Sequence, residues 1–591
     1  MTVTTFLATA IALSLHCADR GGWTFVEKTV QVAEGVQEYE LRMTSDKPAR
    51  PPMFDLTFAL PQVDIVQKWQ ASGSRAPMPP DWSSACKGVS TLSSGIPVYA
   101  FVNGADENRL TLAVSEAKRK VAVNMGNREE GCLATVGIYC FTEPEAPISD
   151  YSMKVRIDMR NVFWSRAIAD GAAWCTSVQS APPAAVPPAA REPVYSSWYG
   201  FHQQVSDAKL ERECAIAAGM GMRTLIVDDG WQTDDSSRGY AFCGDWEVST
   251  KRFPDMRAHV EKIHALGMKY VVWVGVAMVG YNSKAYRKFQ GKFLREDKYL
   301  RTAVFDPRFP EVREHIASLL ELRAREWNID GYKLDFIDSF HFNGTDPAIA
   351  QNYAGRDVKS LPEAVDLLMT DITRRLRAIK PDCLVEFRQS YIGPVIRKYG
   401  NMIRAGDCPG DCLQNRRSVV DLRLTSGNTA VHSDMLEWHP SDTPENAARS
   451  ILAVLFSTIQ YSMVLGDLPP SHRKVIAHYL DFTRRHADTL LTGEFRPHAP
   501  QANYPWIEAE GKDELIVAVY EKDALARIRT TSKTVYVMNV TSSDEFAVDL
   551  AGAPRFAEAY DAMGHRADRA VPSAGLVRLN CPKAGFVKLV Y

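Results

Sequence analysis

The sequence predicts an α/β fold: a (β/α)8 TIM barrel flanked by an N-terminal β-sandwich domain and a small C-terminal β domain. From residue 195 to 490, apolar runs of strand type alternate with amphipathic helical patterns, which is typical of parallel βα units. The regions before and after contain short strand-like runs separated by Gly, Pro, Asp and Asn. With 591 residues, the chain is too long for one hydrophobic core, so several domains are expected.

The domain boundaries follow from changes in composition. Residues 1–180 are predicted to form the β-sandwich domain, from runs such as VQVAEGVQEYELRM and YSMKVRIDM. Residues 181–194 contain APPAAVPPAA, and we predict a stiff extended Pro/Ala linker because proline lacks the backbone N–H that helices and sheets use. The barrel is predicted at 195–490, and an antiparallel β domain with strands such as KTVYVMNV at 491–591.

Eight apolar runs account for a closed barrel. Stretches between them, such as PEVREHIASLLELRAREW, place apolar residues every three or four positions and predict the outer helices. The runs lie at residues 195–201, 224–230, 269–279, 331–338, 383–389, 401–407, 428–435 and 461–467.

The charge balance points to a neutral small molecule as partner. Lys and Arg total 69 against 71 Asp and Glu, so neither nucleic acid nor an anionic membrane is an expected partner. No stretch reaches the length of about 18 apolar residues that a membrane span requires. The 11 cysteines form no CxxC pair, which argues against a disulfide scaffold or a zinc site.

The first residues bear on localisation. Residues 6–15 (FLATAIALSL) have the length of a signal-peptide apolar region but lack a preceding Lys or Arg and a clear small-x-small cleavage site. We predict a strand there and hence a cytoplasmic protein, with secreted and periplasmic locations left open.

Charged residues lie at the C-terminal ends of the predicted barrel strands. Catalytic groups of such barrels lie at these ends. Carboxylates in this arrangement serve either divalent metal binding or cleavage of a glycosidic bond. No His/Glu pair has metal-ligand spacing, and the residues alone leave both uses open. The residues at these ends are Asp228, Asp229 and Trp231 (second run), Lys333 and Asp335 (fourth), Glu386 and Arg388 (fifth), Arg404 and Asp407 (sixth), and His432 and Asp434 (seventh).

Glycoside hydrolysis needs two carboxyl groups on opposite sides of the anomeric carbon. We predict that Asp335 and Asp407 converge on one sugar. Lys333 shares a strand face with Asp335 and is expected to lower its pKa, as a nucleophile requires. Asp407 is then expected to be the group that holds a proton near neutral pH.

Structural roles compete with these assignments. Asp338 and Asp434 are expected to be helix caps or loop anchors, and His432 to hold a loop. The alternatives left open are a turn-ordering or a hydroxyl-binding role for the Asp228–Asp229 pair, sugar stacking or shielding of the barrel rim for Trp231, and pairing of Glu386 with Arg388 or contact with substrate.

An ordered series of segments resembles glycoside hydrolase family 36, the melibiase-type α-galactosidases of clan D. The segments are VDDGWQ (227–232), GDWEVSTKRFPDMRAHVEKIHALGMKYVVW (244–273), FDPRFPEVREHI (305–316) and GYKLDFID (331–338). The resemblance implies retaining hydrolysis of a terminal α-linked galactose through a covalent galactosyl-enzyme, with a carbohydrate substrate and neither cofactor nor metal. Homo-oligomers are common in the family.

The resemblance also implies residue roles. Asp335 would form the galactosyl-enzyme, and Asp228 and Asp229 would bind the 4- and 6-hydroxyls of galactose. The other substrate-binding candidates are Trp198 or Trp231 packing on the sugar, Lys333 and Arg404 near the reaction centre, and Trp273, Glu386 and Arg388.

Two departures from the family pattern leave alternatives. The family's acid/base Asp closely follows an Arg on the sixth strand, where Asp407 is preferred because it ends the strand and Asp411 is the runner-up. EFRQSY (386–391) stands where many members have a Cys/Gly-rich segment facing the sugar's 2-position. Other hypotheses are therefore an α-N-acetylgalactosaminidase, a raffinose-synthase-like galactosyl transferase and a catalytically silent sugar-binding protein.

Overall fold

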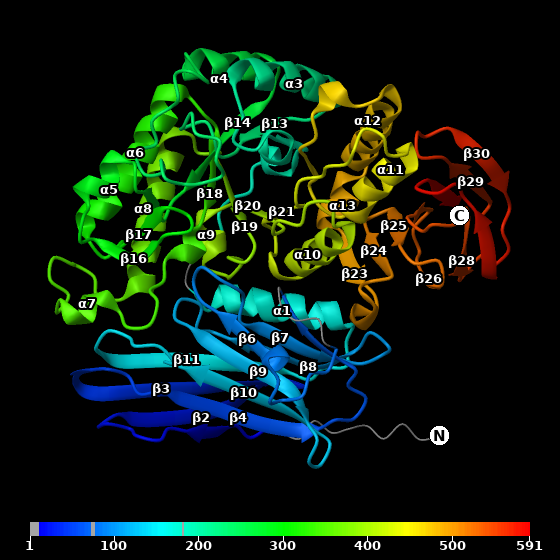
Figure 1. Cartoon of the computed structure of the whole chain (residues 1–591). Helices are drawn as coiled ribbons and strands as arrows, with labels where there is room; N and C mark the ends of the chain where they lie inside the picture. Colours follow the sequence, from blue (N-terminus) through cyan, green and yellow to red (C-terminus); the bar gives the residue numbers. More distant parts are fainter. Residues whose placement is uncertain (1–10, 72–76, 180–181) are drawn as a thin grey trace.

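An eight-stranded parallel barrel lies between an N-terminal pair of antiparallel sheets and a C-terminal β region in the computed structural model, which describes residues 11–71, 77–179 and 182–591 (Figure 1). The predicted fold class is confirmed. Residues 14 and 15 of the segment that we predicted as a strand lie in β1, and its part before residue 11 lies outside the described residues.

The N-terminal domain packs two antiparallel sheets face to face. In β3, every second side chain (Tyr39, Leu41 and Met43) is buried in the shared core, as expected for a strand with one covered face. One sheet has the order β1 (Ser14–His16), β4 (Phe54–Pro61), β10 (Leu133–Cys140), β9 (Val121–Arg128), β6 (Lys87–Ser90), and the other β2 (Thr24–Ala33), β3 (Val36–Ala49), β11 (Ile148–Asp158), β8 (Asn108–Val114), β7 (Val98–Val102), β5 (Gln67–Gln70).

A helix that the sequence analysis did not predict joins this domain to the others. Helix α1 (Trp164–Ser177) packs against β8 on one side and against barrel helix α10 (Cys412–Thr425) on the other. In Figure 1 it lies between the N-terminal sheets and the barrel. Its first residue, Trp164, is fully buried, stacks on Tyr504 with ring centroids 6.2 Å apart, and donates from Nε1 to Pro497 O at 3.0 Å. Three parts of the chain therefore meet at this helix.

The Pro/Ala segment differs from the expected extended linker at one point. Residues Pro188–Arg191 form a 3-10 turn (η2) with Pro188 at its first position, where the missing N–H would have no partner. The turn is held against the barrel because His432 Nε2 lies 2.8 Å from Ala190 O. His432 thus holds a backbone segment, the role that we expected for it.

All eight predicted barrel strands form. They are buried on both faces, as parallel strands covered by helices are. Between strands β21 and β22 the described residues form isolated bridges in place of a ladder, from His432 to Thr458 and from Leu436 to Tyr461, so the barrel is nearly closed. The order is β21 (Ala430–His432), β20 (Met402–Arg404), β19 (Leu384–Arg388), β18 (Gly331–Asp335), β14 (Lys269–Gly275), β13 (Thr224–Val227), β12 (Val194–Ser196), β22 (Gln460–Tyr461).

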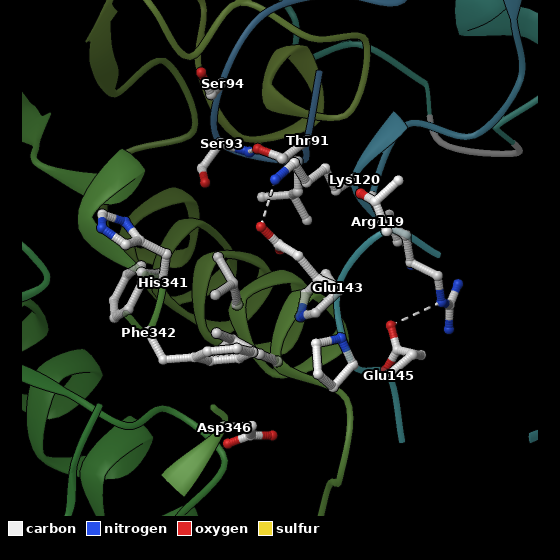
Figure 2. A pocket seen from close by; sticks show the side chains of 18 of the residues that line it. Thr91, Ser93, Ser94, Arg119, Lys120, Glu143, Glu145, His341, Phe342 and Asp346 are labelled. Atoms are coloured by element: carbon white, nitrogen blue, oxygen red, sulfur yellow. Dashed lines mark hydrogen bonds and ion pairs between the residues drawn. The ribbon is translucent and has the colours of Figure 1, made fainter. Parts of the chain in front are cut away.

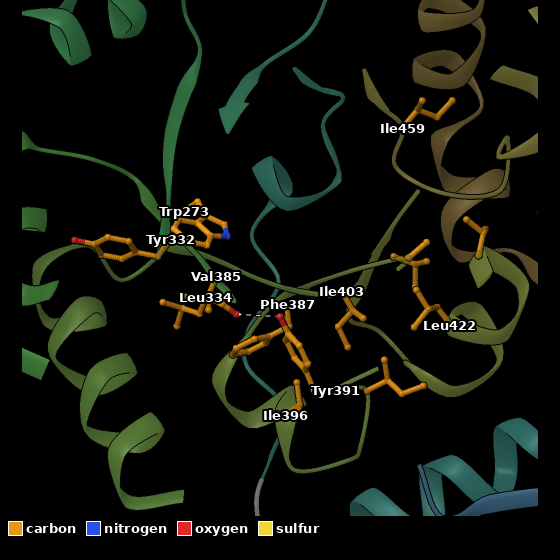
Figure 3. Packing of buried hydrophobic residues seen from close by; sticks show 14 of the residues in the cluster. Trp273, Tyr332, Leu334, Val385, Phe387, Tyr391, Ile396, Ile403, Leu422 and Ile459 are labelled. Carbon is orange, nitrogen blue, oxygen red and sulfur yellow. Dashed lines mark hydrogen bonds between the residues drawn. The ribbon is translucent and has the colours of Figure 1, made fainter. Parts of the chain in front are cut away.

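Side chains along strand β18 alternate between the outside and the inside of the barrel. Tyr332 points outward, because its hydroxyl donates to Leu320 O of helix α6 (Pro310–Trp327) at 2.8 Å. Lys333 and Asp335 therefore point inward. Figure 3 shows Tyr332 and Leu334 among the buried apolar side chains around this strand. Gly331 begins the strand where an added Cβ would lie 1.8 Å from Leu384 O, so only glycine fits.

The remaining helices cover the barrel or its loops, and a small antiparallel sheet follows the third barrel strand. That sheet has the order β15 (Met278–Gly280), β17 (Thr302–Phe305), β16 (Phe293–Asp297). The helices are α2 (Trp198–Phe201), α3 (Asp207–Met220), α4 (Met256–Ala265), α5 (Lys284–Lys288), α7 (Pro347–Ala350), α8 (Leu361–Ile379), α9 (Ile396–Tyr399), α11 (Pro444–Ala453), α12 (Pro470–Arg485) and α13 (Ala487–Thr492).

The C-terminal region has two sheets, and its predicted antiparallel arrangement is wrong for two strand pairs. β25 (Glu514–Val519) pairs in parallel with β27 (Thr534–Asn539) because β26 (Ala526–Ile528), between them in sequence, crosses to the other sheet, where it pairs in parallel with β28 (Glu545–Leu550). The other strands are β23 (Glu494–Pro497), β24 (Trp506–Glu510), β29 (Phe556–Tyr560), β30 (Arg566–Ala570), β31 (Gly575–Asn580) and β32 (Phe586–Val590).

The junction at α1 gives a stability prediction. Trp164→Ala removes a fully buried side chain and should lower the free energy of unfolding by about 3–5 kcal/mol. The matched control is Trp82→Ala, because Trp82 is 73% exposed and its loss should change stability by less than about 0.5 kcal/mol. Equilibrium urea unfolding measures both, and equal stability of the two variants would contradict the role of this junction.

Candidate active site

Asp335 lies at the end of β18 with four hydrogen-bond donors around its carboxylate. Oδ1 accepts from Arg388 Nε (2.7 Å), the Tyr391 hydroxyl (2.8 Å) and the Phe336 backbone N–H (2.7 Å). Oδ2 accepts from Trp273 Nε1 at 3.0 Å. Burial acts to raise the pKa of Asp335, but Arg388 and then Lys333, together with the hydrogen bonds from the two aromatic side chains, outweigh burial and hold that pKa well below its ordinary value. This carboxylate is ionised at neutral pH, as a nucleophile must be.

Lys333 bonds a different carboxylate from the one we expected. Its Nζ lies 2.6 Å from Asp228 Oδ2, and both groups are buried. Burial acts to lower the pKa of Lys333, but the charges of Asp228, Asp335 and Glu386 together outweigh burial and raise that pKa. Lys333 therefore acts on Asp335 through space, with a smaller effect than Arg388.

Asp229 is held separately from its neighbour Asp228. Its Oδ2 accepts from Gln203 Nε2 at 2.6 Å and its Oδ1 from Gln232 Nε2 at 2.5 Å. Burial raises the pKa of Asp229 to about 6, since its hydrogen-bond partners are neutral. The two adjacent carboxylates thus have unlike environments, one paired with a cation and one bonded to amides.

Arg404 connects the strands on the far side of the mouth. It forms an ion pair with buried Asp434, and its Nη2 lies 2.7 Å from Asp407 Oδ1. Asp434 also accepts from the Tyr199 hydroxyl (2.8 Å) and the Cys408 N–H (2.7 Å). Asp434 is therefore an anchor for Arg404 and the loop after β20, as expected from its position.

The two acid/base candidates have different surroundings. The side chain of Asp407 is 53% exposed and contacts Arg404, whereas Asp411 is the N-cap of α10 and accepts from Gln414 N at 2.8 Å. A capping carboxylate is committed to its helix. Asp407 also lies near enough to Asp335 for that charge to raise its pKa. These contacts favour Asp407 over Asp411.

The expected raised pKa of Asp407 is not found in the unliganded site. Burial acts to raise the pKa of Asp407, but Arg404 and then Lys333 outweigh burial, and the net pKa lies below the ordinary value. Its contact with Arg404 could not be inferred from the strand-end pattern alone. A substrate that displaces this contact or excludes water would favour the protonated form.

Glu386 does not pair with Arg388. Its side chain is fully buried and points toward β21 and β22. There its Oε2 accepts from Gln460 Nε2 at 2.5 Å and lies 3.5 Å from His432 Nδ1. Burial raises the pKa of Glu386 to about 7. Arg388 instead turns toward Asp335, so each residue of this pair has its own partner.

The three candidate tryptophans occupy different places. Trp231 is buried, packs between Trp246 and Trp327, and donates to Trp273 O at 2.9 Å, so it belongs to the barrel wall. Trp273 contacts the Asp335 carboxylate. Trp198 is half-exposed and lies against His202, which leaves it available to a ligand.

Sequence reasoning missed Tyr391, Tyr199, Gln203 and Gln460. Each lies in or next to a barrel run, but tyrosine and glutamine are common in loops and carry no distinctive spacing. Tyr391 lies in the EFRQSY segment, and this was the only sequence signal for it.

A cavity of about 430 Å³ lies where the N-terminal domain meets the barrel mouth (Figure 2). The loop at 91–94 and the segment 141–146 line it from the N-terminal domain, and Asp338, His341 and Ser390 line it from the barrel. Gly95 N donates to Ser390 O at 2.5 Å, so the first domain directly supports the loop that follows β19. The volume is within the range of small-molecule sites.

Among residues 11–71, 77–179 and 182–591, no group of three His, Cys, Asp or Glu side chains is arranged to hold a metal ion. Over the same ranges, none of the helices combines the length and hydropathy needed to cross a bilayer.

Comparisons with known proteins show what the chain resembles. Residues 189–379 match the melibiase family. α-Galactosidase C of Emericella nidulans is 30% identical over 167 residues, which are 26% of this chain and 22% of that protein. The matched part is thus well under two thirds of that relative's length.

Solved structures share the fold over most of the chain. A variant of the α-galactosidase AgaA of Geobacillus stearothermophilus, in complex with 1-deoxygalactonojirimycin, has a TM-score of 0.65 at 13% identity and covers 96% of this chain and 82% of its own. Other variants of that enzyme hold raffinose and stachyose.

The buried Glu386 gives a pH prediction. The pKa of Glu386 is about 7 in the folded protein, against an ordinary value of 4.5, so folding takes up a proton at pH values between 4.5 and 7. The stability that this group contributes is therefore lost as the pH rises from 4.5 through 7. Glu386→Gln should therefore lose less stability than the wild type between pH 5 and 8, by up to about 3 kcal/mol. Urea unfolding at both pH values measures the difference.

The control for this prediction is Glu247→Gln, whose side chain is 56% exposed. That variant should follow the wild type at both pH values. A pH dependence of Glu386→Gln as steep as that of the wild type would contradict the protonation of Glu386 in the folded protein.

Proposed function

The chain belongs, through residues 189–379, to the melibiase family of glycoside hydrolases, and on this premise we propose that it is a retaining α-galactosidase. Its substrate is a terminal, non-reducing α-linked galactose of an oligosaccharide or glycoconjugate. The observation that carries the proposal is the ionised Asp335 carboxylate, held by four donors at the barrel mouth and near enough to Asp407 for its charge to act on the Asp407 pKa.

In the first step, an Asp335 oxygen attacks the anomeric carbon while the bond from that carbon to the departing oxygen breaks. Asp407, protonated in the substrate complex, gives its proton to the departing oxygen. In the second step, Asp407 takes a proton from water, water attacks the anomeric carbon, and Asp335 leaves as a carboxylate. The resulting α-galactose keeps the configuration of the substrate.

The other polar groups bind the sugar in this proposal. Asp228, held by Lys333, and Asp229, held by two amides, present carboxylate oxygens to the 4- and 6-hydroxyls, and Trp198 packs on the ring. Complexes of related enzymes with raffinose and stachyose support a galactosyl oligosaccharide as substrate.

Asp335→Asn should lower kcat on an aryl α-galactoside by roughly 10³-fold or more, because the amide cannot form the covalent intermediate. Thermal unfolding checks that the fold is kept. The matched control is Asp481→Asn on helix α12, whose side chain is 45% exposed and which should keep ordinary activity. Ordinary activity of Asp335→Asn would remove the nucleophile assignment.

Asp407→Asn should separate substrates by leaving group. With a galactosyl oligosaccharide, kcat/KM should fall by about 10²–10⁴-fold, whereas a dinitrophenyl α-galactoside, whose leaving group needs no proton, should lose much less. Asp411→Asn is the control, since asparagine keeps the helix cap of α10 and only the charge is lost. Equal losses on both substrates, or a leaving-group effect in Asp411→Asn instead, would contradict the assignment.

A panel of aryl α-glycosides of galactose, N-acetylgalactosamine, glucose and arabinose tests the sugar itself. Activity on galactose alone is expected. Product analysis with and without sucrose as acceptor separates hydrolysis from galactosyl transfer, and turnover of any member of the panel excludes a purely sugar-binding protein.

A further inference from the structure

The two oxygens of the Asp335 carboxylate are not equivalent. Oδ1 accepts three hydrogen bonds, from Arg388, Tyr391 and the Phe336 backbone, whereas Oδ2 accepts one, from Trp273. A carboxylate oxygen has two lone pairs. Oδ2 therefore keeps one for the anomeric carbon, and Oδ1 is the oxygen whose charge the protein stabilises.

Among the Oδ1 donors described above, Arg388 is the charged one, and its position is fixed. Its Nη1 donates to Gln389 O at 2.8 Å and lies 3.8 Å from Asp338 Oδ2. The guanidinium lies over the rings of Phe336 and Tyr391, 5.4 and 5.2 Å from their centroids. A planar guanidinium held by rings and hydrogen bonds keeps its orientation when the charge on its partner changes.

The charge on Asp335 changes twice in a retaining reaction. When Oδ2 bonds to the anomeric carbon, the carboxylate becomes a neutral ester and Arg388 loses the nearer of its two anionic partners. When water attacks the same carbon, the bond to Oδ2 breaks, its electron pair returns to the carboxylate, and negative charge reappears on Oδ1 beside Arg388. A fixed cation stabilises the carboxylate before and after the covalent intermediate, but not the ester itself.

We propose that Arg388 is a positioning residue that shortens the lifetime of the covalent glycosyl-enzyme by stabilising Asp335 as the leaving carboxylate of the second step. The inference rests on the proposed function, because it requires Asp335 to be the nucleophile. Arg388 restrains attack by Oδ2 in the first step and accelerates departure of Oδ2 in the second. The same residue keeps the carboxylate pointing at the anomeric carbon.

Arg388→Met tests this, with Arg388→Lys as the conservative variant and Arg166→Met, at a 73% exposed side chain, as control. Each enzyme is mixed rapidly with a dinitrophenyl α-galactoside, and released dinitrophenol is followed. We expect Arg388→Met to give a burst close to one equivalent of enzyme, followed by a steady-state rate about 100-fold below that of the wild type. Arg388→Lys should recover part of the steady-state rate.

Intact-mass measurement during turnover, with peptide mapping, shows whether galactose is attached to Asp335. The intermediate should accumulate in Arg388→Met and decay with the same slow rate constant as the steady state. A general loss of structure would slow both phases and give no burst. A burst rate that falls as much as the steady-state rate, or no accumulation in Arg388→Met, would overturn the inference.

Failure of the inference and failure of the proposed function have different signatures. A slow-turnover 2-deoxy-2-fluoro-α-galactosyl reagent labels Asp335 of the wild type if the proposed function holds. Label on wild-type Asp335 combined with an unchanged intermediate lifetime in Arg388→Met rejects the role of Arg388 alone. A wild type that turns over the substrate without ever carrying a sugar on Asp335 rejects both.

Discussion

Charge buried inside a nearly closed barrel requires a partner, and this requirement organises the mouth of the barrel. Asp335, Asp228 and Asp434 are each buried and each contact one cation: Arg388, Lys333 and Arg404, respectively. Removing one member of such a pair leaves an uncompensated charge, which typically costs 3–5 kcal/mol. These ion pairs therefore fix the ends of the strands relative to one another. The same charged side chains that would contact a ligand also hold the site together.

The strands, and the carboxylates that end them, were predictable because alternation along a parallel strand is a local property. Tyr332 and Leu334 point outward, so Lys333 and Asp335 point into the barrel, as the sequence implies. Partner choice was not predictable, since it depends on register between strands. Lys333 lies level with Glu386, yet its ammonium reaches Asp228, and Arg388 turns to Asp335. Helix α1 and the parallel pairs of the C-terminal region were missed for the same reason: their partners are distant in sequence.

The N-terminal domain contributes to the site as well as to stability. Its loop at 91–95 bonds Ser390, two residues after Arg388, and lines the cavity beside Asp338. Helix α1 fixes the same domain to the barrel and to the C-terminal region through Trp164. Because the loop after β19 is held from outside the barrel, the position of Arg388 depends on two domains. A sugar at the barrel mouth is thus next to a wall that the barrel alone does not supply.

The environments of Asp335 and Asp407 differ in the way that their proposed roles require. Asp335 is buried among four hydrogen-bond donors, and its pKa lies well below its ordinary value. Its carboxylate therefore stays ionised near neutral pH and does not serve as a proton donor. Asp407 is half-exposed and contacts one cation, Arg404, which also has Asp434 as a buried partner. Since Arg404 stays paired when Asp407 moves or becomes neutral, Asp407 can gain and lose a proton without leaving a buried charge alone. The acid/base role therefore falls to the carboxyl group whose ionisation the fold does not depend on.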